Sequence, residues 1–566
     1  MVIAPDSSTL SGTNFWDPVL GRLCKKAEIE QVFPMIWGAA VERGVPGGMD
    51  TVLGERAKET RPLSMLDAFL GRPAVPEDSI YYVIAHSGAA QFDDAAFAGM
   101  YADRGRPSYA PSLMLQVMLL AFHDKVGDEE AEQRCRYDMR WKYALGLGVN
   151  ESGPDRTTIC RFRGRLIANE QAGAAFMRTL RWAREHRVLG RNVDELVDAT
   201  AVFGAGAVQD TLTLIRKARR KLARSLRDQA EHAEWAKGVL AEADEKPGIP
   251  WDDPAARKQA LNTLVEQGKA ALARTDGLAL TAEQEQAREL LQTVLGQDVE
   301  PDDDGGVRIR QGVAKDRVCS VTDPEMRHGH KTSSGRFDGH KAEIGMDRAT
   351  ELITHVEAKP GNSADGEHLA GKMTETEQAA DIQIERMTGD TAYGRPAVRE
   401  AMRQRGTAVL APVTAPHNRG LFTKDDFQIE LEGRSCICPA GKQGRPLFNK
   451  DGDLAGFRFQ PKTCAACPLR TQCTTSKRQG RTVAVRPDEA MYQVFRAEQE
   501  TEAWKAEYRV RPRVEHKISE LVHHGMRQAR YVGLVKTQLQ LLFTAAVVNL
   551  KRLAVLCAGR TLPIEL

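Results

Sequence analysis

The stretch "NVDELVDATAV", residues 192–202, marks the point where the pattern of the chain changes from helical to extended. It is short, rich in strand-forming residues and ends in small residues, so we predict a strand from about Val193 to Val202. The segments "KAEIGMD" and "ELITHVEAK" predict two more strands, and "IERMTGDTAYG" predicts a strand that ends at Asp390. A helical segment, "PAVREAMRQRG", then leads to the strand "AVLAPV". This alternation predicts an α/β core, with a further strand expected at "DRVCSVTDP", residues 316–324.

Helical patterns precede this core. The segment "SLMLQVMLLAFHDKV" begins behind Pro111, with Ser112 as the expected N-cap. Two further helices follow, and the last of them, "DRTTICRFRGRLI", is basic because it contains Arg156, Arg161, Arg163 and Arg165. Three short helices with a basic third one resemble a helix-turn-helix arrangement, in which Arg161 and Arg163 would contact DNA. An ordinary helical bundle with a solvated basic face explains the same pattern equally well.

A second helical block interrupts the core between about residues 212 and 311. Its first part, "TLTLIRKARRKLARSL", repeats apolar residues at helical spacing and carries a dense basic run on its polar face. A solvated helix face usually mixes the two signs of charge, but here no acidic residue follows until Asp228. We therefore expect phosphate contacts from part of this run, namely Arg216, Arg219, Arg220 and Arg224.

The composition limits the classes of protein that this chain can be. Its 566 residues, 42% of them hydrophobic, suggest about three or four domains. A net charge of +2 gives no indication of partners, so only local clusters of charge are informative. The N-terminal residues lack the features of a signal peptide, and the apolar stretch "LQLLFTAAVVNL" is too short to span a bilayer. We expect a buried helix at this stretch and a soluble, cytoplasmic protein with no membrane partner.

Five of the ten cysteines fall in one short segment: Cys436, Cys438, Cys464, Cys467 and Cys473. A C-x-C pair, a C-x-x-C pair and one further cysteine suit a tetrahedral zinc site of thiolates, although five candidates exceed the four places. Free thiols are the alternative. Catalytic zinc is not expected, since no suitably spaced histidine or carboxylate leaves an open position. The segment therefore predicts structural Zn²⁺ in a reducing compartment.

Three carboxylates are candidates for a catalytic centre. Asp198 lies in the first predicted strand, Asp390 at the end of a later one, and Glu515 in the basic helical stretch "YRVRPRVEHKISEL". Three such side chains can hold two divalent cations about 3.5–4 Å apart, an arrangement that promotes phosphoryl transfer. An isolated aspartate after a strand is more often a turn residue, and spacing alone does not select these three from 77 acidic residues.

The local sequences do select them. The motifs "LVDATAV", "TGDTAYG" and "YRVRPRVEHKISEL" resemble the DDE insertion-sequence transposases of the RNase H-like class. The similar bacterial subgroup has an N-terminal helical domain and a cysteine-rich insert before the glutamate, and the resemblance covers roughly residues 92–200 and 312–560. It implies an RNase H-like α/β catalytic core in which three acids are catalytic and bind two Mg²⁺ or Mn²⁺ ions: Asp198, Asp390 and Glu515.

The same resemblance bears on the other candidate sites. The stretches "CPAGK" and "CAACPLRTQC" look like the family's insert, which favours four zinc ligands, Cys438, Cys464, Cys467 and Cys473, with Cys436 as the spare. Many relatives carry a tyrosine, an arginine three residues later, a glutamate four later and a lysine seven later. Tyr508, Arg511 and Glu515 match, whereas Val522 stands at the lysine position. The resemblance implies DNA contacts from Tyr508 and Arg511, with Lys517 or His523 as candidate substitutes for the lysine, both off the shared helix face.

The implied function is that of a DNA transposase of the bacterial nucleoid. It would bind the terminal inverted repeats of its insertion sequence as a homodimer on double-stranded DNA, cleave the ends and join them to target DNA. An inactive DNA-binding repressor, or an RNase H-like nuclease in repair or defence, remains an alternative. The predicted layout is an N-terminal helical domain for DNA binding or dimerisation (1–185), a catalytic core (186–211, 312–430 and 487–560), a helical insertion (212–311) and a zinc-binding insert (431–486).

Overall fold

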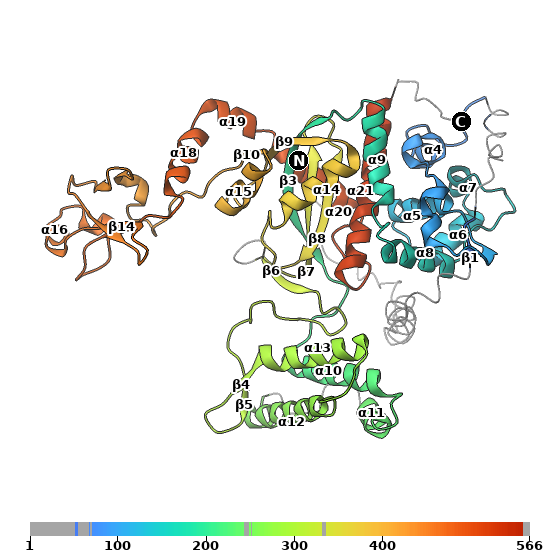
Figure 1. Ribbon diagram of the computed structural model, residues 1–566, viewed down its shortest axis with the longest axis horizontal. Helices are drawn as coiled ribbons and strands as arrows, with labels where there is room; N and C mark the ends of the chain where they lie inside the picture. The colour runs from blue at the N-terminus through green and yellow to red at the C-terminus, as the bar shows by residue number, and fades with distance from the viewer. Residues whose placement is uncertain are drawn as a thin grey trace, which may run out of the picture. The chain divides into compact units, whose positions relative to one another are not determined.

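The computed structural model of the chain describes residues 51–54, 67, 71–242, 248, 250, 252–330 and 335–558 (Figure 1). The chain divides into two compact units. Among the described residues, the smaller contains those at 51–54, 95–108 and 215–309, and the larger contains those at 67–94, 109–214 and 310–558. The larger unit holds the sheet and all three candidate acids, so it is the unit that positions the site.

A mixed sheet of six strands forms the centre of the larger unit (Figure 1). Its central strand is β3, which pairs in parallel with β9 on one side and antiparallel with β7 on the other. β10 extends the sheet beyond β9, while β8 and β6 both pair with β7. The strands are β3 (Asn192–Phe203), β6 (Arg327–His330), β7 (Arg336–Asp347), β8 (Ile353–Pro360), β9 (Gln383–Thr388) and β10 (Ala408–Leu410).

The predicted α/β class is confirmed, because strands and helices alternate through this unit. Every strand predicted between residues 192 and 202 and between residues 341 and 413 is present, although the observed ends differ from the predicted ones. The strand expected at residues 316–324 is wrong. This segment consists of turns and irregular backbone, and the Asp323 carboxylate accepts a hydrogen bond from the backbone amide of Gly533, 3.1 Å away. A short strand-like composition was therefore overridden by tertiary contacts.

Helices cover the sheet and continue the chain between its strands. α20 (Pro512–His523) packs against β3 and β7, and α14 (Leu369–Ala380) packs against β8 and β9. Under α20, Val514 joins Leu196 and Met346 in a buried apolar cluster. The remaining helices of the strand-rich region are α15 (Pro396–Gln404), α18 (Glu489–Gln499) and α19 (Glu502–Tyr508).

The long helix α21 (Leu534–Cys557) joins the N-terminal helices to the sheet (Figure 1). Its Gln538 and Asn549 side chains exchange hydrogen bonds with the backbone of β8, which is an edge strand. On its other side Phe543 stacks on Phe122 at 5.4 Å. The N-terminal helices are α4 (Ile80–His86), α5 (Pro111–His123), α6 (Asp128–Tyr137), α7 (Met139–Leu145), α8 (Arg156–Ala168) and α9 (Ala174–Glu185).

Two details of these helices differ from expectation. α21 is longer than the apolar stretch suggested, and by length and composition it could cross a membrane. However, 72% of its most apolar window is buried inside the protein. The prediction of a buried helix is therefore confirmed. Ser112 is not the N-cap of α5. It lies within the first turn, and the Asp94 carboxylate accepts its backbone N–H at 2.7 Å.

The smaller unit is a helical bundle with a short hairpin. Ala223, Ala236 and Val239 form a buried cluster within it, and a capping box of Thr281 and Gln284 opens α13. Its elements are most of α10 (Thr211–Leu226), then α11 (Ala233–Ala241), α12 (Pro254–Ala273), α13 (Ala282–Asp298), β4 (Val299–Pro301) and β5 (Val307–Ile309); β1 (Thr51–Val52) and β2 (Arg106–Pro107) pair in the same unit.

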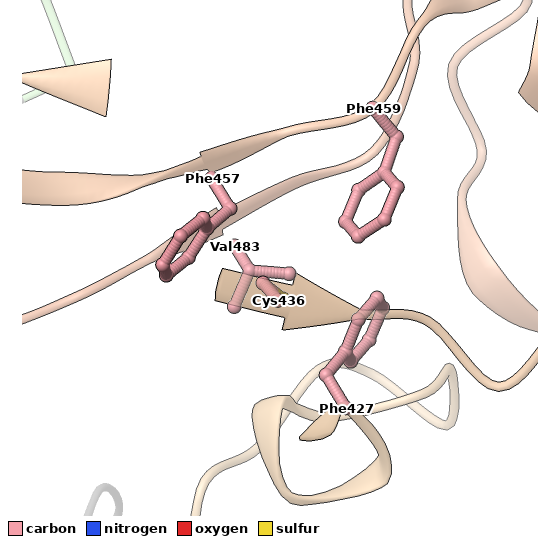
Figure 2. Packing of buried hydrophobic residues seen from close by; sticks show 5 residues of the cluster. All are labelled: Phe427, Cys436, Phe457, Phe459 and Val483. Carbon is pink, nitrogen blue, oxygen red and sulfur yellow. The ribbon is translucent and has the colours of Figure 1, made fainter. Parts of the chain in front are cut away.

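The cysteine-rich segment folds around an apolar core of its own, in which Phe427, Phe457 and Phe459 pack with Val483 (Figure 2). Phe457 lies in the middle strand of a three-stranded antiparallel sheet. The elements are β11 (Gln428–Glu430), β12 (Ser435–Ile437), β13 (Arg445–Phe448), β14 (Leu454–Arg458), α16 (Pro461–Ala465), α17 (Arg470–Cys473) and β15 (Thr482–Ala484).

Candidate active site

The pairing of β3 with β9 brings Asp198 and Asp390 to the same level of the sheet. The two strands run parallel, with Leu196 opposite Thr388. Asp198 and Asp390 each follow two residues later, so they are level with one another. β9 ends at Thr388, which places Asp390 just beyond its carboxyl end, whereas Asp198 lies inside β3. Long-range strand pairing therefore juxtaposes two carboxylates that are distant in the sequence.

Glu515 comes from the first turn of α20. Val514 packs the helix onto the sheet, against Leu196 and Met346. Glu515 is the next residue of this helix, so it lies next to that contact. Arg511 connects the two acids: its Nη2 lies 3.0 Å from Asp198 Oδ2, and its Nη1 donates a hydrogen bond to Glu515 Oε1. The guanidinium therefore lies between the carboxylates of Asp198 and Glu515.

The electrostatics of Asp198 match a cluster of acids. Burial raises the pKa of Asp198 to about 6. Arg511 and the backbone N–H of Ala199 act in the opposite direction, while the charges of Asp390 and Glu515 raise the pKa further. Like charges this close favour the neutral form unless a cation compensates them. A further cation, in addition to Arg511, would therefore stabilise the charged form of Asp198.

Tyr508 faces the same cluster. Burial raises the pKa of its phenol, and the charges of all three acids act on it as well. Its ring stacks on Trp504, with ring centroids 4.7 Å apart. Sequence reasoning missed Trp504, although the two aromatic residues stand four positions apart, a spacing that places them on one helix face.

The three acids supply only oxygen donors, and such donors suit Mg²⁺ or Mn²⁺. Another group, Cys319, His328 and Asp338, has candidate ligand atoms all within 4.8 Å of one another. There, however, His328 hydrogen-bonds Asp338 through Nδ1 and Arg317 through Nε2, the latter at 3.1 Å. With both ring nitrogens engaged and a guanidinium alongside, we interpret this group as a hydrogen-bonded cluster without metal.

Two of the basic residues expected to contact DNA are engaged inside the protein. Lys517 is buried and its Nζ lies 2.8 Å from Glu520, so it does not substitute for the lysine missing at Val522. Arg163 is also buried, pairs with Asp128 and lies 4.8 Å from the centre of the Tyr531 ring. These two expectations are corrected for that reason. Arg161 is exposed, and its DNA contact stays a prediction.

The basic run of α10 is largely internal. Arg216 and Arg219 are buried, and Arg219 hydrogen-bonds Gln267 and Glu242 from other helices of the bundle. Arg220 donates to backbone carbonyls at the end of α11, including Val239 O at 3.2 Å. The expected phosphate contacts of these three arginines are therefore corrected. Arg224 is exposed, so its contact with DNA stays a prediction.

Four of the five clustered cysteines line one cavity: Cys438, Cys464, Cys467 and Cys473. Burial raises the pKa of the Cys473 thiol, and the other three thiols of this cavity add to that effect. Cys436 instead points into the apolar core between the phenylalanines and is fully buried (Figure 2). The cavity thus presents four sulfur atoms, the number that a structural zinc site requires.

Two segments of the chain match known family models. Residues 437–554 match a family model described as a transposase DDE domain, and residues 71–165 match one described as a transposase domain, DUF772. No curated protein and no solved structure matches the chain. The first match includes Glu515 and begins within the cysteine-rich segment, while both aspartates precede it.

Both matched segments are transposase domains, and together they indicate a DNA transposase. The chain carries a DDE transposase domain, which implies catalytic cleavage of DNA and strand transfer, together with an N-terminal transposase domain. The predicted enzyme class is therefore confirmed, and DNA is implied as its substrate.

Proposed function

We propose that the chain is an insertion-sequence transposase whose RNase H-like core uses Asp198, Asp390 and Glu515 as its catalytic triad. It binds the terminal inverted repeats of its element, cleaves the ends and joins them to target DNA. The observation that carries this proposal is the proximity of the three acids: Asp390 is level with Asp198 across the paired strands, and Arg511 contacts both Asp198 and Glu515. The strand order β8-β7-β3-β9-β10, with only β7 running opposite to the others, supports an RNase H-like core.

The three carboxylates would hold two Mg²⁺ or Mn²⁺ ions. When bound, such ions activate the attacking oxygen and stabilise the leaving oxygen of an in-line phosphoryl transfer. The chain itself has to orient the DNA. Tyr508 lies beside the acids, and Arg511 is within reach of a phosphate at the same place, so both would fix the scissile bond. Because positioning and charge stabilisation suffice for this reaction, no covalent intermediate on the protein is required.

Structural Zn²⁺ would be held by Cys438, Cys464, Cys467 and Cys473. Their lining of one cavity supports this ligand set, and the burial of Cys436 in the apolar core supports its exclusion. A bound zinc ion would stabilise a small insert whose apolar core contains only a few side chains. We also propose that the protein acts as a homodimer on double-stranded DNA, because pairing two ends needs two active sites, and that it works in the cytoplasm at the nucleoid.

A strand-transfer assay tests the proposal. Labelled DNA carrying the inverted repeats that flank the gene is incubated with the full chain and Mg²⁺, and wild type is compared with Asp198→Asn, Asp390→Asn and Glu515→Gln. Joined products that disappear in all three variants, with binding to end DNA retained, are the expected result. Binding without cleavage by the wild type would indicate a repressor, and cleavage that ignores the repeats would indicate a nuclease.

A further inference from the structure

We propose that Glu343 is a positioning residue of the active site, which acts through Tyr393 on the turn that carries Asp390. This inference rests on the proposed function, because it assigns a role toward the metal-binding acids. Glu343 lies on β7 and Tyr393 follows Asp390 by three residues. Neither was a candidate from the sequence.

The turn after β9 is built around the Tyr393 ring. The backbone N–H of Tyr393 donates to Asp390 O at 3.0 Å, and the N–H of Ala392 donates to Asp390 Oδ1 at 2.8 Å. The fully buried ring covers the backbone just before Asp390, since a Cβ on Gly389 would lie 2.7 Å from it. The position of Asp390 is therefore coupled directly to the position of this ring.

Glu343 fixes the far end of the ring. The Tyr393 hydroxyl donates a hydrogen bond to Glu343 Oε1 at 3.0 Å, and both side chains are fully buried. The same oxygen accepts the backbone N–H of Gly366 at 2.6 Å, from the loop that follows β8. Glu343 Oε2 pairs with the ammonium group of Lys359, which is also buried. One carboxylate thus ties both the turn after β9 and the loop after β8 to the sheet, and it pairs with the cation of Lys359.

The sheet register shows that Glu343 is not a fourth metal ligand. Glu343 lies opposite Ala199 on β3, whereas Asp198 lies opposite Ile344. Directly paired residues point to the same face and successive residues alternate, so Asp198 and Glu343 point to opposite faces of the sheet. Glu343 can therefore influence the metal site only by holding Tyr393, and with it the Asp390 turn.

Partners behind the ligands of a metal site typically change metal affinity by about 10–100-fold. We expect Tyr393→Phe, which removes only one hydroxyl, to raise the dissociation constant for Mn²⁺ by about tenfold in the full chain without DNA. Glu343→Gln should weaken binding at least as much. The double variant Glu343→Gln/Tyr393→Phe should bind no more weakly than Glu343→Gln alone, because both changes act through one contact. Isothermal titration calorimetry with Mn²⁺ measures each constant, and circular dichroism checks the fold.

A matched control is available in the N-terminal helices. Tyr143 is likewise buried and donates its hydroxyl to a carboxylate, Asp67 Oδ2, at 2.7 Å. Tyr143→Phe makes the same chemical change away from the candidate site and should leave the Mn²⁺ constant unchanged.

Asp198→Asn identifies the site that is being measured. If Asp198→Asn abolishes Mn²⁺ binding while a folded Tyr393→Phe binds like the wild type, the positioning role is overturned and the proposed function stands. If Asp198→Asn leaves Mn²⁺ binding intact, the proposed metal site is overturned, and the positioning role with it. If Tyr393→Phe and Tyr143→Phe weaken Mn²⁺ binding equally, the cause is a general loss of stability, and the inference is overturned as well.

Discussion

The guanidinium of Arg511 lies 3.0 Å from the carboxylate of Asp198, although 313 residues separate the two in the chain. The same side chain also reaches Glu515. An arginine that was expected to bind phosphate is therefore shared between two acids expected to bind metal. A cation entering between Asp198 and Glu515 has to displace the guanidinium, and a displaced guanidinium is free to contact a phosphate.

This relationship predicts opposite effects of Arg511→Ala on two ligands. Without its competitor, Mn²⁺ should bind the DNA-free protein up to about fivefold more tightly, because a partly exposed ion pair contributes up to about 1 kcal/mol. End DNA should bind more weakly, because a phosphate contact is lost. Calorimetry and a fluorescence-anisotropy titration measure the two affinities. The exposed Arg509 offers the control, since Arg509→Ala should leave Mn²⁺ affinity unchanged; weaker Mn²⁺ binding by Arg511→Ala would contradict the competition.

Lys359 is expected to be a strong determinant of stability. Its ammonium group compensates the fully buried carboxylate of Glu343, so Lys359→Met leaves a buried charge without its cation. Loss of one partner of such a pair costs about 3–5 kcal/mol. Urea unfolding of the full chain measures the loss. Glu343→Gln combined with Lys359→Met should recover part of it, because the buried charge of Glu343 is then removed together with its cation, while Glu357 still loses its own pairing with Lys359.

The control for this prediction is an exposed pair on α14. Lys372 lies 2.8 Å from Glu375 at the surface, and Lys372→Met should change stability by no more than about 0.5 kcal/mol. Equal losses from Lys359→Met and Lys372→Met would show that Glu343 does not depend on its cation.

The zinc content of cysteine variants tests the ligand set. The full chain, purified without a metal-binding tag, should hold one zinc ion per chain. Inductively coupled plasma mass spectrometry measures this zinc content. Cys464→Ser should lose it, because a thiolate of the cavity is removed, whereas Cys436→Ala should retain it. Loss of zinc from Cys436→Ala with normal content in Cys464→Ser would exchange the two assignments.

His524 should make the protein less stable in mild acid. Burial lowers the pKa of His524 from 6.5 to about 4, and the positive charge of Lys551 adds to the effect. The Lys551 ammonium lies 3.1 Å from His524 Nε2, which suits a neutral imidazole as the acceptor. Between about pH 6.5 and 4 the unfolded chain binds a proton at this residue that the folded chain does not, so stability falls as the pH falls through this window.

The variant His524→Gln isolates this contribution, because glutamine offers an acceptor but does not titrate. The melting temperature of the wild type should decline more between pH 7.5 and 5 than that of His524→Gln. Parallel declines would mean that His524 is protonated equally in the folded and unfolded states.

Local patterns predicted the strand that contains Asp198 and the strand that precedes Asp390. Each of these strands is a run of β-forming residues. The motifs around Asp198, Asp390 and Glu515 predicted the candidate triad. What local patterns could not predict were partners supplied by distant elements. Glu242 and Gln267 approach Arg219 only after the bundle has formed, so a run that looked unpaired in the sequence proved to be internal. In the same way Asp94, which lies outside α5, supplies the carboxylate that accepts the backbone N–H of Ser112 in the first turn of that helix.

The packing of α21 has a consequence for how the protein is made. The edge of β8 and the apolar faces of α5 and α9 are all covered by this one helix, which the ribosome produces after every other helix and strand in the described part of the chain. Until residues 534–557 have emerged, those surfaces stay open to water and to other nascent chains. Release of a shortened polypeptide would therefore yield a species prone to aggregation and a natural client for chaperones.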